Sequence, residues 1–184
     1  MKRRRQRRRY GPGSYPRKAL GNGTTTELMR FNLFVYGTLK RGQSNHERFC
    51  RGLISVQEAT VRGRLYELSV GFPALVVPDA DVRATGTMKY LADAEADRYN
   101  EVEASEIPSS WDTVQGELLV FDDPEERLPM LDDLEGFRPG EKSFYRRVLI
   151  PATLLETGAT VPAWGYALRS ASGLYLRGGR WPAI

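Results

Sequence analysis

The sequence of 184 residues contains one cysteine and one histidine, and these two scarcities exclude several kinds of catalytic site. Cys50 alone cannot form an internal disulfide, which is typical of proteins kept in a reducing cytosol. His46 alone cannot supply the two histidines of an H-E-x-x-H helix or a three-histidine zinc site. A Ser-His-Asp or Cys-His site would have to use His46, and no G-x-S-x-G sequence is present. We interpret His46 as a packing residue and Cys50 as a small buried side chain.

The common phosphate, dinucleotide and membrane signals are also missing. There is no G-x-x-x-x-G-K-[ST] loop, no G-x-G-x-x-G after a strand, and no apolar run near the ~20 residues of a spanning helix. The paired acids Asp122-Asp123 and Asp132-Asp133 could hold Mg²⁺, but such pairs on exposed helices are more often solvated surface. We therefore expect a cytoplasmic protein without membrane contact. If it is an enzyme, it should use no metal and no cofactor, and act through a carboxylate or backbone donors.

Positive charge is concentrated at the start of the chain. Residues 1–30 hold 10 of the 27 Lys and Arg residues and one acid, Glu27, so residues 31–184 are net negative. Like charges at the density of residues 1–9 repel one another and favour disorder. We expect 1–30 to be a disordered basic extension and 31–184 to be one domain. Two interpretations stay open for the extension: a mis-assigned start or leader sequence, or salt-sensitive contact with nucleic acid through residues 1–9.

Short strand patterns begin at Phe31. The apolar and aromatic run Phe31–Tyr36 predicts a strand that enters a turn at Gly37. The S-x-x-E pattern of Ser44–Glu47 predicts a capping box and a short helix ending near Gly52. Further strands are expected at Val61–Leu68, Phe72–Val77, Thr85–Leu91, Val114–Phe121, Phe144–Ile150 and Val161–Leu168, an exposed helix at Ala92–Ala104, and irregular structure from Gly173 to Ile184.

A second clear helix is expected at Pro124–Leu134. Proline suits the first turn of a helix, the leucines recur on one face, and Gly136 follows as a stop. Many short strands with few short helices, and no internal repeat, predict an α+β domain built on a curled, barrel-like mixed sheet.

The strongest local signal is the segment Val35–Gly42. A strand stops there at a glycine turn, and consecutive unpaired N–H groups in such a turn can form a concave anion site. An ordinary strand-to-turn corner is the alternative that these residues alone leave open.

Four motifs together resemble the γ-glutamylcyclotransferase-like family, closest to its γ-glutamylamine branch. They occur in the family's order and cover about Phe31 to Leu168, nearly all of the expected domain. The motifs are Y-G-T-L-K-R-G-x-x-N-H at Tyr36–His46, G-F-P-A-L at Gly71–Leu75, V-x-G-E-L at Val114–Leu118, and L-D-D-L-E-G at Leu131–Gly136 followed by Tyr145-x-Arg147.

The resemblance implies the family's fold, reaction and site. Glu135 is implied as the catalytic acid/base that helps convert a γ-glutamyl amine or γ-glutamyl amino acid to 5-oxoproline and free amine, without metal. The implied substrate-binding residues are Tyr36, Gly37, Thr38, Leu39, Gly71, Phe72, Pro73 and Tyr145. Such chemistry needs few parts, because nucleophile and electrophile lie in one molecule and one positioned carboxylate can move the proton.

Glu135 has a structural alternative as a solvated acid at a helix end. A negative charge at a helix C-terminus is unfavourable, which favours a functional purpose. Asp132 and Asp133 are rival acids, and the leucine face predicts that both point outward. The leaving amine is open, as is the choice between monomer and homodimer. The alternatives are the same fold acting as a transferase on another small acyl or amide substrate, and a non-catalytic binding module with an RNA-binding tail.

Overall fold

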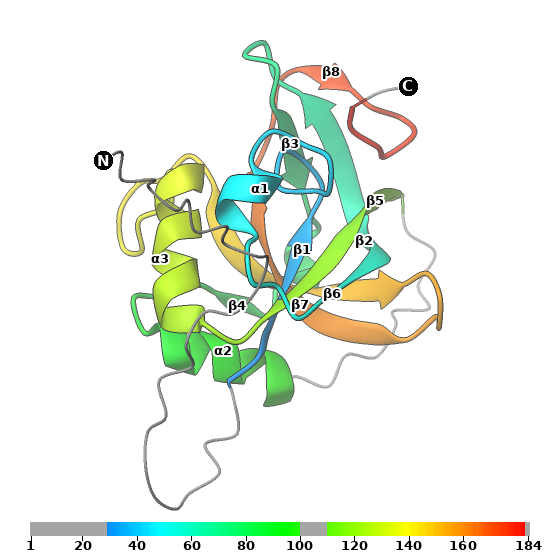
Figure 1. The fold of residues 1–184 in the computed structure, drawn as a ribbon. Helices are drawn as coiled ribbons and strands as arrows, with labels where there is room; N and C mark the ends of the chain where they lie inside the picture. Colours follow the sequence, from blue (N-terminus) through cyan, green and yellow to red (C-terminus); the bar gives the residue numbers. More distant parts are fainter. Residues whose placement is uncertain (1–28, 100–109, 183–184) are drawn as a thin grey trace, which may run out of the picture.

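A closed ring of strands forms the centre of the molecule (Figure 1). The computed structural model describes residues 29–99 and 110–182. The strands follow one another in the order β2-β5-β1-β7-β6, and β6 returns to β2 through Ala59↔Leu154 and Thr60↔Thr153. The pair β1–β7 is parallel and the other pairs of the ring are antiparallel. The predicted α+β class with a barrel-like mixed sheet is therefore confirmed.

The elements in chain order are β1 (Phe31–Val35), α1 (His46–Phe49), β2 (Ser55–Glu67), β3 (Pro73–Val76), a 3₁₀ turn (Asp79–Asp81), β4 (Ala84–Thr85), α2 (Tyr90–Tyr99), β5 (Asp112–Phe121), α3 (Pro124–Glu135), β6 (Arg146–Leu154), β7 (Thr160–Ala167) and β8 (Leu174–Tyr175). Strand β2 is long enough to leave the ring: its first part pairs with β5, and its end pairs with β3 and β8.

Alternating side chains of β1 enter two different cores. Leu33 and Val35 belong to the cluster that contains Leu128 and Leu131 of α3, so they face the helices. Phe34, between them, belongs to the second cluster, which is made of alternate residues from the ring strands and fills the barrel. This period of two is what a strand buried on both faces requires. Side chains on both faces of β1 are packed in hydrophobic clusters, and this packing positions the end of the strand where the chain turns at Gly37.

Two sequence predictions around α2 were wrong. The run Thr85–Leu91 is not a strand, because β4 ends at Thr85 and α2 begins at Tyr90. The Asp93 carboxylate accepts hydrogen bonds from the Thr87 amide at 2.7 Å and the Thr87 hydroxyl at 3.0 Å. These bonds fold the chain back at Thr87, so the helix begins at Tyr90, two residues before the predicted start at Ala92. The helix is also not simply exposed, since Asp93 and Ala94 are buried. The predicted continuation of the helix past Tyr99 lies outside the described residues.

Smaller differences have local causes. The predicted capping box does not form, because Asn45 is the N-cap residue of α1 and its side chain donates to Thr38 Oγ1 at 2.9 Å. Strand β6 begins at Arg146, which leaves Phe144 in the preceding loop. The C-terminal segment contains the short strand β8, which adds to the end of β2. The predicted disordered extension covers residues 1–30, of which 1–28 lie outside the described residues. Within the described residues no helix is both long and apolar enough to cross a membrane.

Candidate functional site

A cavity of about 370 Å³ opens between the turn after β1 and the end of α3. Two loops complete its wall: the β2–β3 turn and the segment between α3 and β6. The lining residues are Phe34, Val35, Tyr36, Gly37, Thr38, Leu39, Asn45, Leu68, Val70, Phe72, Pro73, Asp133, Leu134, Glu135, Gly136, Phe144, Tyr145 and Tyr166.

The first wall is the turn at 36–39. Among the described residues, the backbone N–H groups of Gly37, Thr38 and Leu39 have no intramolecular acceptor, so they remain available to a ligand. Helix α1 holds the turn in place: the Leu39 carbonyl lies 2.8 Å from His46 Nδ1 and 3.6 Å from Cys50 Sγ. His46 and Cys50 therefore act as packing residues beside the turn. A row of free amides at a cavity wall suits a carboxylate or a developing oxyanion.

The opposite wall carries Glu135, the last residue of α3. Gly136 follows in the left-handed conformation, with a φ of 64°, and its backbone ends the helix with bonds to the carbonyls of Asp132 and Asp133. This cap leaves Glu135 half-buried at the cavity. Burial raises the pKa of the Glu135 carboxyl to about 7, because a charge with little water around it is unfavourable. A carboxyl with a pKa near neutral can both take and return a proton.

Two phenols stand near this carboxyl. Burial raises the pKa of Tyr36 well above its usual value, and burial and the Glu135 charge do the same for Tyr145. Both hydroxyls therefore stay protonated. Tyr36 donates to the Tyr166 carbonyl at 2.9 Å, and Tyr145 donates to the Pro73 carbonyl at 2.9 Å. These bonds connect the cavity walls to β7 and to the first residue of β3.

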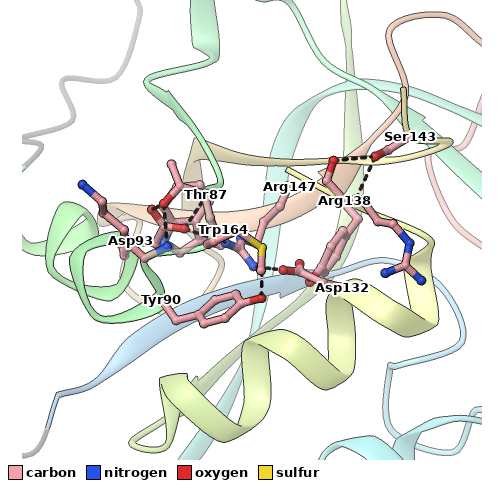
Figure 2. Close-up of polar contacts among 11 residues, drawn as sticks. Thr87, Tyr90, Asp93, Asp132, Arg138, Ser143, Arg147 and Trp164 are labelled. Atoms are coloured by element: carbon pink, nitrogen blue, oxygen red, sulfur yellow. Dashed lines mark hydrogen bonds and ion pairs between the residues drawn. The ribbon is translucent and has the colours of Figure 1, made fainter. Parts of the chain in front are cut away.

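A buried charge network includes Asp132, which lies on α3 three residues before Glu135. Arg147 is fully buried and donates to Asp132 and to Asp93, each at 2.5 Å. Figure 2 shows Arg147 between the two carboxylates, with Trp164 beside them. The Tyr166 hydroxyl donates to the second oxygen of Asp132 at 2.7 Å. The network therefore joins α2, α3, β6 and β7 around the turn of helix that ends at Glu135.

The prediction that Asp132 points outward was wrong, because Asp132 is buried in this network. Its neighbour Asp133 does point outward, and it forms an exposed ion pair of 3.2 Å with Arg138. Helical spacing places Asp132 at the edge of the leucine face, and the residue that makes its burial possible, Arg147, lies on a different element.

A family model of "Gamma-glutamyl cyclotransferase, AIG2-like" proteins matches residues 33–111 and 105–183, which together include both walls of the cavity. The chain belongs to this family. The resemblance seen in the four sequence motifs is thereby confirmed. One relative, the γ-L-glutamyl-butirosin B γ-glutamyl cyclotransferase of Niallia circulans, is 26% identical over 152 residues, which are 82% of this chain and 74% of the relative. The family and this relative support a γ-glutamyl cyclotransferase activity.

Solved structures agree on the fold of this AIG2-like chain. An AIG2-like protein of Mus musculus is 22% identical to this chain, with a TM-score of 0.50. The matched region includes 77% of this chain and 80% of the mouse protein. YkqA of Bacillus subtilis is 19% identical, with a TM-score of 0.51 over 83% of this chain and 40% of its own. At these identities the likeness concerns the fold alone.

The cavity of the AIG2-like chain brings together most of the residues predicted for the site. Glu135 lies on one wall, and seven of the eight predicted binding residues line the remainder. Gly71 does not line the cavity; it has a φ of 82° and shapes the turn that carries Phe72.

Sequence reasoning missed several lining residues, among them Val70, Phe144 and Asn45. Val70 and Phe144 lie in loops, where apolar side chains follow no periodicity. The one available signal was that Val70 and Phe144 are apolar and each stands next to a predicted binding residue, Gly71 and Tyr145 respectively.

Gly37 is expected to tolerate no larger side chain, for a reason of space. Its φ is not in the left-handed region, but an added Cβ would lie only 2.6 Å from Cγ of Pro73, which also lines the cavity. Gly37→Val should raise KM for a γ-glutamyl amide and lower stability by about 1–3 kcal/mol, as overpacking does. Steady-state kinetics and denaturant unfolding measure both. Gly178→Val is the matched control, since an added Cβ there meets nothing within 4 Å. An unchanged KM in Gly37→Val would contradict the role of the turn.

Proposed function

We propose that this chain is a metal-independent γ-glutamyl cyclotransferase in which Glu135 is the general acid/base. The substrate class is a γ-glutamyl amine or γ-glutamyl amino acid. The observation that carries the proposal is the position of Glu135: a carboxyl with a pKa raised to about 7 faces, across a cavity, a turn with free backbone amides.

The reaction is intramolecular and needs no second reactant. The α-nitrogen of the substrate forms a bond to the carbonyl carbon of its own γ-amide, and the bond from that carbonyl carbon to the leaving nitrogen breaks. The products are 5-oxoproline and an amine. If the site holds the glutamyl chain folded back, with its α-nitrogen near its γ-carbonyl, the activation free energy of ring closure can fall by several kcal/mol.

Glu135 would move the proton that this exchange requires. The substrate's α-amine arrives mainly as ammonium and must lose a proton before it attacks. The leaving nitrogen must gain a proton before it departs. One carboxyl can do both in turn, and such catalysis contributes about 10²- to 10⁴-fold.

The turn at 36–39 would hold the negative charge. Its amides can bind the substrate's α-carboxylate or the oxyanion that develops on the γ-carbonyl. Among the described residues no Lys, Arg or His lines the cavity, so backbone donors are the main source of positive potential that this part of the chain supplies there.

Release of 5-oxoproline from a panel of γ-glutamyl amides tests the proposal. The α-glutamyl isomers of the same amines are matched controls, because their α-amine would have to close a three-membered ring. We expect 5-oxoproline and free amine from the γ-isomers and no amine from the α-isomers. Absence of 5-oxoproline across the whole panel would overturn the proposal.

Chelation of metal ions is expected to leave the rate unchanged. Within residues 29–99 and 110–182 no group of three His, Cys, Asp or Glu side chains could hold a metal ion, and the proposed steps need only a carboxyl and amides. The measurement is 5-oxoproline release before and after EDTA treatment. A rate that disappears with EDTA and returns with a divalent cation would contradict the mechanism.

A further inference from the structure

Lys40 and Arg41 follow directly after the turn at 36–39, and neither side chain lines the cavity. Lys40 N donates to the Gly37 carbonyl at 3.1 Å, which closes the turn. Arg41 attaches the turn to β5, because its backbone N–H and its Nε donate to the two carboxylate oxygens of Glu117 at 2.9 and 2.8 Å. The residues after the turn therefore bind parts of the chain that lie outside the cavity.

The half-buried side chain of Lys40 binds the C-terminal segment, which we define as residues 176–182. Lys40 Nζ donates to the backbone carbonyl of Trp181. The donor is an ammonium group, so this hydrogen bond is charge-assisted and stronger than one between neutral groups. The position of the turn thus depends on where the C-terminal segment lies.

The C-terminal segment is itself attached to the barrel. Leu176 N donates to the Leu65 carbonyl of β2 at 2.8 Å, and Gln115 N of β5 donates to the Gly179 carbonyl at 2.7 Å. The Trp181 side chain packs against the hydrophobic cluster that fills the barrel. These contacts with β2, β5 and the barrel core position the Trp181 carbonyl.

Gly179 allows the C-terminal segment to lie close against β5. Its φ of 59° is in the left-handed region, and an added Cβ would overlap the backbone carbonyl oxygen of Thr113. Because that oxygen belongs to a strand, it cannot move aside as a flexible side chain would. A side chain at Gly179 would therefore push the segment away from the barrel, whereas an added Cβ at Gly178 would meet nothing within 4 Å.

On the basis of the proposed function, we infer that Lys40 is a positioning residue. Its bond to Trp181 lets the C-terminal segment hold the amides of 36–39 in place for the substrate's α-carboxylate. Lys40 would not touch the substrate, because it does not line the cavity and its Nζ is bound to Trp181. Glu135 lies on the opposite wall, so loss of this bond should weaken substrate binding and leave proton transfer intact.

Substitution of Lys40 tests the bond, with the γ-glutamyl amide of the panel that the wild-type chain converts fastest. Lys40→Met should raise KM by about tenfold, which corresponds to about 1.4 kcal/mol, and leave kcat nearly unchanged. Lys40→Arg keeps a cationic donor and should recover most of the loss. Lys89→Met is the matched control, since Lys89 is exposed and does not line the cavity.

A substitution away from the turn separates positioning from direct contact with substrate. Gly179→Ala should raise KM about as much as Lys40→Met, and the control Gly178→Ala should not. The double variant Lys40→Met/Gly179→Ala should have a KM no higher than the larger of the two single values, because both changes remove the same bond. Thermal unfolding checks that each variant folds, and the Lys40 variants decide the question if Gly179→Ala does not fold.

Three results would overturn the inference and leave the cyclotransferase proposal standing. The first is a wild-type KM in Lys40→Met. The second is a wild-type KM in a folded Gly179→Ala variant, which would show that Lys40 acts without the C-terminal segment. The third is a double variant in which the two effects on KM multiply. Absence of 5-oxoproline from the wild-type chain across the whole panel would instead overturn the proposed function, and this inference with it.

Discussion

Glu135→Gln is expected to lower kcat for 5-oxoproline release by about 100-fold or more, because the substitution keeps the shape of the side chain and removes the proton acceptor. KM should change little, since the amides of 36–39 and the other residues that line the cavity remain. Glu125→Gln is the matched control: the same substitution on the same helix, at an exposed position in its first turn. A Glu135→Gln variant that releases 5-oxoproline at a near-normal rate would end the proposed role of Glu135.

The same variant should keep or raise its melting temperature at pH 8. The folded-state pKa of Glu135 is about 7, above the value of about 4.3 for an unfolded glutamate. The stability that goes with this raised pKa is present below the unfolded pKa and is lost as pH rises through 7. At pH 8 the wild-type chain therefore has an unfavourable, partly desolvated charge at Glu135, and glutamine removes it. Loss of activity with retained stability separates a catalytic role from a structural one.

Arg147→Met is expected to lower the free energy of unfolding by about 3–5 kcal/mol. The guanidinium is fully buried and donates to Asp93 and Asp132, so its removal leaves two buried carboxylates without their cation. It also lies over the rings of Tyr90 and Trp164, at 5.4 and 5.5 Å from their centroids. Denaturant unfolding at neutral pH measures the loss.

Arg138→Met is the matched control for Arg147. Arg138 also pairs with an aspartate of α3, Asp133, but both side chains are mostly exposed. Exposed pairs contribute about 0–1 kcal/mol, so this variant should unfold close to the wild-type midpoint. Similar losses in the two variants would show that burial is not what makes the Arg147 network important.

The parts of the fold that follow from short-range patterns could be predicted from the sequence. Pro124 and Gly136 mark the ends of α3, and its leucines mark the buried face, so Glu135 was placed correctly at the end of a helix. The strand Phe31–Val35 was equally clear from its composition. Closure of the barrel between β2 and β6 was less accessible, because pairing of strands so far apart leaves no periodic signal.

Features that depend on distant partners could not be predicted. Asp132 looks like an exposed helical acid until Arg147 and Tyr166 are placed beside it. The same holds for Gly37, whose need for glycine comes from the ring of Pro73 rather than from its own backbone angles. Phe144 appeared to begin a strand and instead lies in a loop, where it lines the cavity.

The pH dependence of kcat/KM for 5-oxoproline release tests the central claim most directly, because it reports the ionisation of the free enzyme's essential base. The claim is that the half-buried carboxyl of Glu135 accepts the proton and must be ionised to do so. We predict that kcat/KM rises with pH and levels off above an apparent pKa of about 7, and that the residual activity of Glu135→Gln lacks this step. A wild-type profile that is flat between about pH 5 and 8, with its only acidic step near the ordinary glutamate value of about 4.3, would contradict the account.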